Sequence, residues 1–394
     1  MKKPALVVFN TQPPHLYFGG VERRIIETAK LLKNDFDIVI CSGTKREFKQ
    51  GVTLDGAIIV PFRSTDIAFP LDNWLFNQSI SRASYRIEAD VFEAHAVSGY
   101  RFLRTLRKKD RRTPFIQTIH GVLADEYLQA SLSNLSVREK LANYFMRQLS
   151  ESEKEAAQKA DVVVTVSNYS LTRIVSLYDI SEEKIRVVPN GVDAERFKPN
   201  EAGEAKAKYG LTDKQVVLFV GRLIPRKGLT YLLEAALKVI KENPQTIFMV
   251  VGNGPLRKFL NVELERLNIS RHFMFMGDVR DEELPLIYSC ADVFALPSIQ
   301  EGQGIALLEA QASTKPVVAF DVSGVREAVV NGTSGLLVEK GNSWALAKVL
   351  LDLLSNPSLR QKMGFAGREF VLRNFTWEMC AEKMLKVYKQ TLGL

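Results

Sequence analysis

The chain has 394 residues, of which 46% are hydrophobic and 25% charged, values typical of a globular protein and not of a disordered or fibrous one. This length exceeds what one ordinary hydrophobic core accommodates, so two domains are expected. The formal net charge of +8 is moderate, and no apolar run approaches the ~20 residues that a membrane-spanning helix needs.

Short apolar runs alternate with helical patterns along the chain. The first series of expected strands is 5–9, 37–41, 57–60, 91–94, 115–118 and 162–166, and an amphipathic helix is expected at 21–32. The second series is 216–220, 246–251, 273–276, 293–296, 316–320 and 335–338, with helices at 230–241 and 343–354. Runs that are apolar on both faces and alternate with helices predict parallel sheets covered by helices. We therefore expect an α/β protein with two doubly wound domains facing each other, joined near the polar segment 199–210.

The cysteines and the start of the chain bear on its compartment. Cys41, Cys290 and Cys380 are too scattered for a disulfide framework and lack the spacing of metal ligands. We expect them to be buried thiols in a reducing environment. The apolar run at 5–9 has no cleavage site after it and is interpreted as a first strand, not a signal peptide. These features favour a cytoplasmic protein.

A glycine-rich turn flanked by two glutamates carries the strongest chemical signal. The segment 297–310 follows an expected strand, turns on two glycines and enters a helix at about Ile305. Such a turn lets the backbone approach a ligand closely, and the N–H groups of a helix start attract oxygen and negative charge. Glu301 lies on the turn and Glu309 just over one turn into the helix, so they can bind hydroxyls at opposite ends of one nucleotide sugar. The alternative is an ordinary helix start with Glu309 in solvent.

This segment resembles the signature of the retaining glycosyltransferases of family 4, which have the GT-B fold of two Rossmann-like domains. The family pattern is Glu-x7-Glu, usually opening Glu-Gly-Phe-Gly. The resemblance implies that Glu301 is catalytic and contacts the donor sugar, and that Glu309 binds the ribose. Gln303 stands where the family usually has Phe. The N–H groups of Gln303 and Gly304 are expected to reach sugar hydroxyls, while the Gln303 side chain alters donor preference.

A basic loop, 221–228, follows the first strand of the second series. Arginine can make two parallel hydrogen bonds to phosphate oxygens and lysine adds a compact charge, so such a loop can stabilise a departing diphosphate. Alone, a loop of this kind is as often a solvated turn. It is similar to the family's Gly-Arg-Leu-x3-Lys-Gly motif, which implies that Arg222 and Lys227 are the catalytic clamp on the diphosphate.

Three shorter elements add weaker signals. Gly19 and Gly20 open a helix after the first strand, where exposed N–H groups attract phosphate, and they match the family's Gly-Gly-x-Glu loop, which implies contact with the donor phosphate. His120 ends an expected strand; a lone histidine is more often structural, but the similarity to a Thr-x-His-Gly element implies a catalytic contact with the transferring sugar. The resemblance also places Val279 and Arg280 near the nucleobase.

The resemblance covers nearly the whole chain and implies its division into domains. Residues 1–200 are expected to form the acceptor-side domain and 201–374 the domain that binds the nucleotide sugar. The last segment, 375–394, resembles the helix that returns to the N-terminal domain. The similarity is loosest over 42–160, where acceptor recognition should lie.

These elements together predict a retaining transferase that moves a sugar from a nucleotide diphosphate sugar to a hydroxyl of a sugar, lipid-linked or small-molecule acceptor. The resemblance implies that the acceptor enters on the face of the departing diphosphate, which takes its proton, so neither glutamate need attack. No Asp-x-Asp motif is evident, and we expect no cofactor and no essential metal. The alternatives are a sugar phosphorylase or disaccharide synthase on the same fold, and a non-catalytic subunit that binds nucleotide sugars. A nicotinamide enzyme is disfavoured by the glycine spacing.

Much of the positive charge gathers in the segment 101–112. The simplest interpretation is a solvated helix face. The alternative is a surface that attracts anionic lipid at the inner membrane face or a phosphorylated acceptor. Nucleic acid is not expected as a partner, because aromatic residues are not interleaved with the charges.

Overall fold

The structure is a computed structural model that describes residues 2–17, 19–44, 48–65, 70–131, 137–199 and 202–394. It divides into two compact units, the first formed by Met1–Asn190 with Trp377–Leu394 and the second by Gly191–Thr376. The chain thus passes between units at Asn190 and at Thr376, and the residues 200 and 201, where the sequence placed the first boundary, lie outside the described part. The α/β class with two doubly wound sheets is confirmed.

The first unit is built on a sheet whose described strands follow the order β3-β4-β2-β1-β5-β6-β7-β8. Its strands are β1 (Ala5–Asn10), β2 (Asp37–Gly43), β3 (Val52–Leu54), β4 (Ala57–Phe62), β5 (Val91–His95), β6 (Phe115–Ile119), β7 (Val162–Thr165) and β8 (Ile185–Val187). All neighbours pair in parallel except β3 with β4. The sequence missed β3 and β8 because three residues are too few for a periodic pattern.

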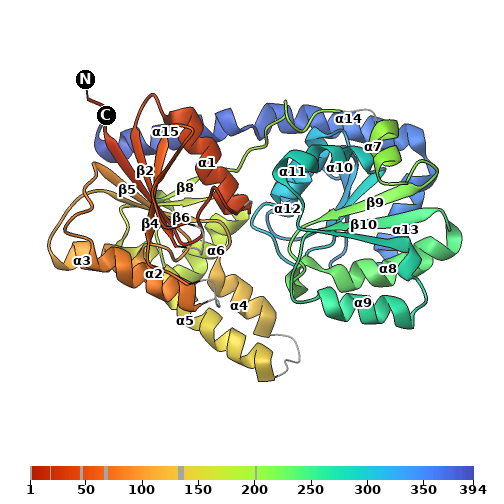
Figure 1. Cartoon of the computed structure of the whole chain (residues 1–394), viewed down its shortest axis with the longest axis horizontal. Helices are drawn as coiled ribbons and strands as arrows, with labels where there is room; N and C mark the ends of the chain where they lie inside the picture. Colours follow the sequence, from red (N-terminus) through yellow and green to blue (C-terminus); the bar gives the residue numbers. More distant parts are fainter. Residues whose placement is uncertain (1, 18, 45–47, 66–69, 132–136, 200–201) are drawn as a thin grey trace. The chain divides into compact units, whose positions relative to one another are not determined.

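Helices cover both faces of this sheet. They are α1 (Gly20–Leu32), α2 (Leu71–Arg82), α3 (Tyr100–Lys108), α4 (Leu123–Ser131), α5 (Val137–Lys159), α6 (Asn168–Tyr178) and α15 (Trp377–Leu392). Figure 1 shows α15 beside α1, on the face opposite α2 and α3. The ring of Tyr388 on α15 meets Phe36 edge to face at 5.2 Å between centroids. The last helix of the chain therefore completes the core of the first unit.

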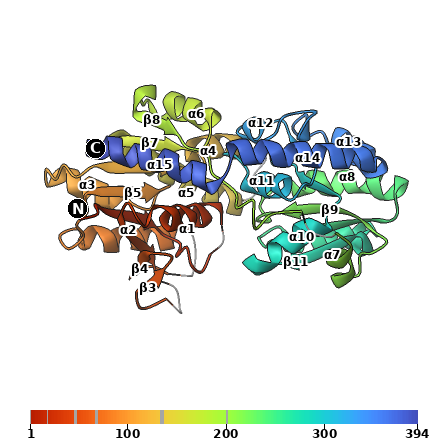
Figure 2. The ribbon, with the colours of Figure 1, turned by 90° about the horizontal axis from the view of Figure 1, so that it is seen from above.

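The second unit has a fully parallel sheet with the described order β11-β10-β9-β12-β13-β14. Its strands are β9 (Gln215–Val220), β10 (Thr246–Val251), β11 (Phe273–Gly277), β12 (Val293–Leu296), β13 (Val317–Phe320) and β14 (Gly335–Val338). Its helices are α7 (Ala202–Lys208), α8 (Leu229–Glu242), α9 (Arg257–Arg266), α10 (Leu284–Cys290), α11 (Ile305–Ala312), α12 (Val325–Ala328), α13 (Ser343–Ser355) and α14 (Pro357–Asn374). Figure 2 shows α13 next to α8, an arrangement that their contacts support.

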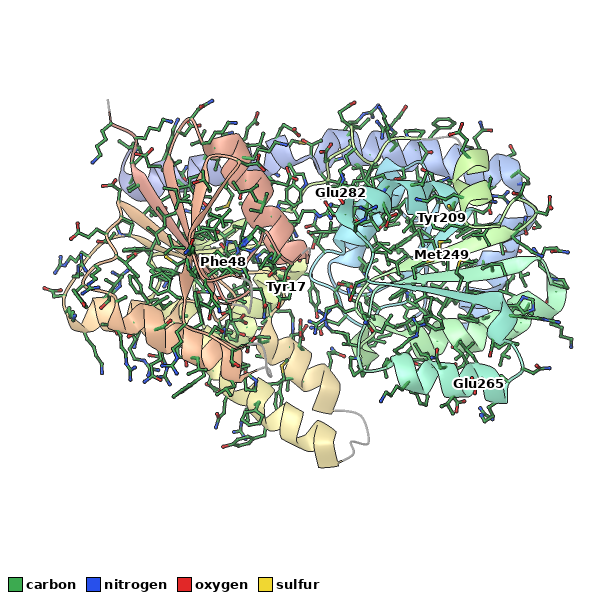
Figure 3. All side chains as sticks on the ribbon, in the orientation of Figure 1. Tyr17, Phe48, Tyr209, Met249, Glu265 and Glu282 are labelled. Carbon is green, nitrogen blue, oxygen red and sulfur yellow. The ribbon has the colours of Figure 1, made fainter. Side chains whose placement is uncertain are left out.

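The core of the second unit lies on both faces of its sheet. Leu218 of β9 and Phe294 of β12 are fully buried, as expected for central strands covered by helices. Figure 3 shows Met249 of β10 inside this unit, whereas Glu265 lies on the outer helix α9. Among the described residues no helix combines the length and the apolarity that crossing a membrane requires.

Strand order marks one special position in each sheet. Counted from β9, the order of the second sheet is that of a Rossmann fold, with the chain reversing direction between β9 and β12. The run β4-β2-β1-β5-β6-β7 repeats this arrangement in the first unit, with the reversal between β1 and β5. Ligands of open α/β sheets bind at such switch points, outside the carboxyl ends of the strands.

Candidate functional site

Two loops meet at the switch point of the second unit. One joins β9 to α8 and contains a short 3-10 turn, η2 (Pro225–Lys227); the other joins β12 to α11. The backbone N–H of Ile299 donates to the carbonyl of Arg226 at 2.9 Å, and an Arg226 side-chain N–H donates to the carbonyl of Gln300 at 3.3 Å. These bonds hold the basic loop and the acidic loop against each other.

Gly228 allows this close approach. Its φ is +70°, in the left-handed region, and a Cβ atom built there would lie 1.7 Å from the carbonyl oxygen of Pro297. Any side chain at this position would therefore force the two loops apart and strain the backbone. The glycine directly after Lys227 is thus required by the geometry of the site.

Lys227 and Glu301 form an ion pair where the loops meet. The Lys227 ammonium contacts Glu301 Oε1, which also accepts a hydrogen bond of 2.7 Å from the hydroxyl of Ser298. Arg226 adds a second cation, 3.7 Å from Glu301 Oε2. Glu301 is only 6% exposed, so the carboxylate is almost buried beside two positive charges. The convergence of a basic and an acidic residue that the sequence predicted is present for this pair.

The neighbours of Glu301 decide its ionisation. Burial alone would raise its pKa, but the charges of Lys227 and Arg226, with hydrogen bonds from Lys227 and Ser298, outweigh burial and hold the pKa below its ordinary value. Glu301 therefore stays an anion at neutral pH, and its oxygens can accept hydrogen bonds from hydroxyl groups.

The turn and helix after Glu301 follow the sequence expectation. Gly304 has a φ of +90° and precedes α11, which begins at Ile305 as expected. Gln303 is 3% exposed, so its side chain is part of the interior. Glu309 is 5% exposed and accepts a 2.7 Å hydrogen bond from the hydroxyl of Tyr288. The alternative of a solvated Glu309 is therefore wrong.

The other predicted residues of this unit are more exposed. Arg222 follows β9 and is exposed, and its side chain forms no hydrogen bond or ion pair with any residue that the structure describes. Val279 packs partly against the core after β11, whereas Arg280 is exposed and lies 3.5 Å from Glu283. The structure thus brings Lys227 together with Glu301 but leaves Arg222 in solvent, and the roles of Arg222, Val279 and Arg280 stay predictions.

Gly19 and Gly20 lie at the switch point of the first unit. Gly19 caps the N-terminus of α1 and Gly20 is its first residue, so both follow the loop after β1 as expected. Glu22, one turn further, accepts a 3.1 Å hydrogen bond from the side-chain amide of Asn10 at the end of β1. The helix start is thereby tied to the strand end, and its exposed N–H groups suit an anion.

His120 lies directly after β6, in contact with a histidine that the sequence analysis did not single out. Its Nε2 lies 2.9 Å from Nδ1 of His95, the last residue of β5. His95 Nε2 in turn lies 3.4 Å from Oε1 of Glu93 on the same strand. Burial lowers the pKa of both imidazoles well below the ordinary value, so both rings are neutral at pH 7.

Buried polar residues are the signal that could have identified these partners. Glu93 and His95 sit in a strand whose residues are all buried, and charged residues rarely occupy such positions without a partner. Their partners lie on other strands and helices, so the run itself shows only that a partner exists. Ser298 and Tyr288 are ordinary loop and helix residues in the sequence, and only the packing reveals them.

The basic segment largely pairs within the first unit. Arg104 forms two hydrogen bonds with Glu155 of α5, and Arg107 lies 2.5 Å from Asp161. The hydrogen bond from Arg104, strengthened by Lys159 and by both charges, lowers the pKa of Glu155 to about 2 despite partial burial. Lys108 and Lys109 are exposed. Arg104 and Arg107 therefore hold α3 against its neighbours in the first unit, and the end of the helix is solvated, as the simplest interpretation predicted.

The cysteines also follow the expectation. Cys41, Cys290 and Cys380 are free and buried. Burial raises the pKa of the Cys41 thiol to about 12 and that of Cys290 to about 11, so neither is a reactive thiolate at neutral pH.

Two family models match the chain, one on each unit. The model described as Glycosyltransferase Family 4 matches residues 18–196, and the model described as Glycosyl transferases group 1 matches residues 202–370. The second contains Lys227, Glu301 and Glu309, so the residues that converge in the structure fall within the matched region.

Curated relatives agree with these models. The chain is 37% identical, over 55% of its length and 59% of the relative's, to a GDP-mannose-dependent alpha-(1-6)-phosphatidylinositol monomannoside mannosyltransferase of Mycolicibacterium smegmatis. It is 32% identical, over 72% of its length and 63% of the relative's, to a D-inositol 3-phosphate glycosyltransferase of Nocardia farcinica. The match thus spans about three fifths of the length of these relatives.

Solved structures share the fold over the whole chain. A sucrose-phosphate synthase from Thermosynechococcus elongatus superimposes with a TM-score of 0.84 at 20% identity, covering 100% of both chains. Anabaena Alr3699/HepE, in complex with UDP and glucose, superimposes with a TM-score of 0.78 at 20% identity, covering 98% of this chain and 99% of the other. The chain belongs to glycosyltransferase family 4 and has the GT-B fold.

Proposed function

We propose that this protein transfers a sugar from a nucleoside diphosphate sugar to an acceptor hydroxyl with retention of the anomeric configuration. The observation that carries the proposal is the ion pair of the half-buried Lys227 with the buried Glu301 at the switch point of the second unit. The cation suits the diphosphate, and the carboxylate suits the hydroxyls of the sugar beside it. Glu309, held by Tyr288, is a second acceptor on the same face of the switch point and fits the ribose hydroxyls.

The proposed reaction breaks the bond between the anomeric carbon and the diphosphate oxygen and forms one to the acceptor oxygen on the same face. The acceptor proton passes to the departing diphosphate, so no carboxylate attacks. Negative charge develops on the diphosphate as the bond breaks, and the fixed charge of Lys227, with Arg222, stabilises it. In the first unit, we assign the helix start at Gly19 and Gly20 to contact with a phosphate. Glu301 orients the sugar, and for the first unit we assign His120 to a contact with a sugar hydroxyl.

The names of the relatives suggest the substrates. A GDP-mannose-dependent mannosyltransferase and an inositol phosphate glycosyltransferase are among the curated matches, and structures of Alr3699/HepE contain UDP or UDP-glucose. We propose a hexose on guanosine or uridine diphosphate as donor. As acceptor we propose a hydroxyl of a cyclitol or of a sugar-bearing lipid, in glycolipid or glycan biosynthesis.

The donor experiment is a thermal-shift screen of GDP-mannose, UDP-glucose and an adenosine diphosphate sugar, followed by a transfer assay with the binding donor. A ligand that binds only the folded state raises the melting temperature, by an amount that grows with its affinity. We expect one donor to stabilise the protein and an α-linked donor to give an α-linked product by NMR. An inverted product, or sugar phosphate formed from inorganic phosphate, would contradict the proposal. Binding without transfer or slow donor hydrolysis would indicate a non-catalytic subunit.

We further propose that catalysis needs no divalent metal, because Lys227 supplies the positive charge that a metal provides in other enzymes. Transfer in EDTA should then stay within about twofold of the untreated rate. A loss that Mg²⁺ restores would contradict this part of the proposal.

We also propose that the exposed end of α3 contacts anionic headgroups when the acceptor is a lipid. Lys108 and Lys109 are exposed, and Arg101 stacks on the rings of Trp74 and Tyr100 at 5.4 and 5.8 Å. Reversing both lysines to glutamate should abolish co-sedimentation with phosphatidylserine vesicles at low salt, because each basic residue near such a surface is worth about 1 kcal/mol. Lys241→Glu/Lys258→Glu on the second unit is the control for net charge. If this control loses vesicle binding to the same extent, net charge and not the end of α3 determines binding.

A further inference from the structure

A line of polar contacts runs through the core of the first unit and ends at His120. The hydroxyl of Tyr388 on α15 donates to Glu93 Oε2, and that of Thr118 donates to Glu93 Oε1 at 2.5 Å. Glu93 Oε1 faces Nε2 of His95 at 3.4 Å, and His95 Nδ1 faces Nε2 of His120 at 2.9 Å. The line therefore joins the last helix of the chain to the candidate sugar-binding histidine.

The interior of this line is closed to water. Glu93 and His95 are each 2% exposed, and Thr118 is fully buried. The two imidazoles stack at 5.2 Å between centroids with their planes 23° apart. Each polar atom in the line must therefore find its partner within the protein, which leaves few arrangements of protons.

The carboxylate selects one of these arrangements. Both oxygens of Glu93 already accept from hydroxyls, so they present lone pairs to His95. A neutral His95 avoids repulsion by carrying its proton on Nε2, which leaves Nδ1 as an acceptor. The partner of that acceptor, His120 Nε2, must then donate. His120 Nδ1 is left with a lone pair and has no partner among the described residues.

We propose that Glu93 and His95 are positioning residues that hold His120 as the Nε2–H tautomer, so that its Nδ1 accepts a hydrogen bond from a sugar hydroxyl. This assignment rests on the proposed function of the site as a sugar-binding one. Tyr388 of α15 holds Glu93 in place, so α15 also takes part in positioning His120. The side chain facing the sugar is then an acceptor only, and it selects a hydroxyl over a carboxylate or an ether oxygen at that position.

The decisive measurement is the tautomer of His120 in the full chain, read from the ¹⁵N shifts and ring couplings of histidine-labelled protein at pH 7. The chain has four histidines, and a His120→Gln variant assigns the signal. In the natural protein we expect the Nε2–H form. His95→Leu removes the acceptor and should give a mixture of the two His120 tautomers. His95→Asn keeps an amide oxygen near the position of Nδ1 and should restore the Nε2–H tautomer of His120. An unchanged tautomer in His95→Leu overturns the proposal, whether or not the protein transfers sugar.

Activity provides a second readout. With the donor that the screen identifies, kcat/KM should fall about tenfold in His95→Leu, the value of one hydrogen bond, and stay within about threefold in His95→Asn. A donor lacking the contacted hydroxyl should show no further loss in His95→Leu. An equal loss of kcat/KM with both donors would contradict the role of Nδ1 but would not contradict the proposed transfer reaction.

Tyr388→Phe tests the anchor if the His95 variants fail to fold. The change removes one hydroxyl far along the chain from every residue assigned to the donor and should shift the His95 and His120 ¹⁵N signals. Thr391→Val is the matched control, because the Thr391 hydroxyl donates to the Val387 carbonyl of its own helix at 2.7 Å and to no other residue that the structure describes. Equal spectra for Tyr388→Phe and the natural protein would exclude the anchoring role.

Discussion

The two units share a strand order but differ in the chemistry at their switch points. In the second unit a half-buried cation, Lys227, meets a buried carboxylate, Glu301. In the first unit the corresponding edge carries a helix start after β1 and two neutral imidazoles after β5 and β6. The Rossmann arrangement thus positions loops without choosing their chemistry. Fixed charge suits a diphosphate, whereas neutral rings suit uncharged hydroxyls. The substitutions below test the charged switch point of the second unit against the neutral one of the first.

The largest effect is expected from Gly228→Ala. A Cβ there would overlap the Pro297 carbonyl at 1.7 Å, so the loops must separate and both the backbone strain and the lost packing destabilise the fold. We expect a loss of more than ~3 kcal/mol in the free energy of unfolding, measured by urea denaturation. Gly210→Ala is the matched control, because Gly210 has a similar φ of +68° with no atom within 4 Å of the added Cβ. Its cost should be the strain alone, ~1 kcal/mol; equal losses in both variants would show that the loop contact is unimportant.

Lys227→Ala should lower transfer by at least ~100-fold, equivalent to ~2.7 kcal/mol. The change removes the cation at the diphosphate and leaves Glu301 with a weaker partner, Arg226, at 3.7 Å. Initial rates and calorimetric binding of the nucleoside diphosphate measure the two effects separately. The exposed Lys241 on α8 provides the control, and Lys241→Ala should leave both unchanged. Near-normal transfer in Lys227→Ala would contradict the proposal that Lys227 stabilises the departing diphosphate.

Glu153 of the first unit sharpens the comparison, because it is a buried carboxyl that forms no ion pair with any residue in the described part of the chain. Its Oε2 accepts from the Tyr178 hydroxyl at 2.5 Å and from the N–H of Leu123 at 3.0 Å, just after His120. Burial outweighs these bonds and raises its pKa from 4.5 to about 8. The folded protein therefore keeps the proton after the unfolded chain has lost it, and the free energy of unfolding falls as pH rises from 4.5 towards 8.

Glu153→Gln should remove this dependence. Between pH 5 and pH 8 the natural protein should lose ~3 kcal/mol of its free energy of unfolding that the variant keeps, measured by thermal unfolding of both. Glu155→Gln is the control, since the pKa of Glu155 lies at about 2 and its stabilisation is lost only as pH falls from 4.5 towards 2. This variant should keep the natural protein's change in stability between pH 5 and pH 8. An equal change in stability between pH 5 and pH 8 in the natural protein and in Glu153→Gln would contradict the assignment.

The smallest effect is expected from Tyr288→Phe. It removes the 2.7 Å hydrogen bond that holds Glu309 and should weaken donor binding by up to about tenfold, seen as a higher donor KM with little change in kcat. Tyr231→Phe is the control, because the Tyr231 ring packs on Phe320 and its hydroxyl has no hydrogen bond within the described residues. Identical KM values for the two variants would contradict a role of Tyr288 in ribose binding.

The alternation of apolar runs and the motif residues were readable from the sequence, because burial on both faces and turn chemistry leave local patterns. The start of α11 at Ile305 and the span of α8, Leu229–Glu242, lie within one residue of expectation. Strands of three residues such as β3 were missed, since so short a run has no period. The sequence left a solvated Glu309 open as the alternative, because the partner that holds the buried carboxylate, Tyr288, lies on a different helix.

What the tertiary structure alone decided is which side chains meet. Lys227 and Glu301 are 74 residues apart, and Tyr388 and Glu93 are 295 apart. The crossovers between parallel strands bring such residues to one edge of a sheet, and nothing in the local pattern records which strands become neighbours. Composition and periodicity thus determined the kinds of element and the chemistry on their loops. The order of the strands, set by packing of the whole unit, determined that a lysine faces a glutamate in one half and a histidine faces a histidine in the other.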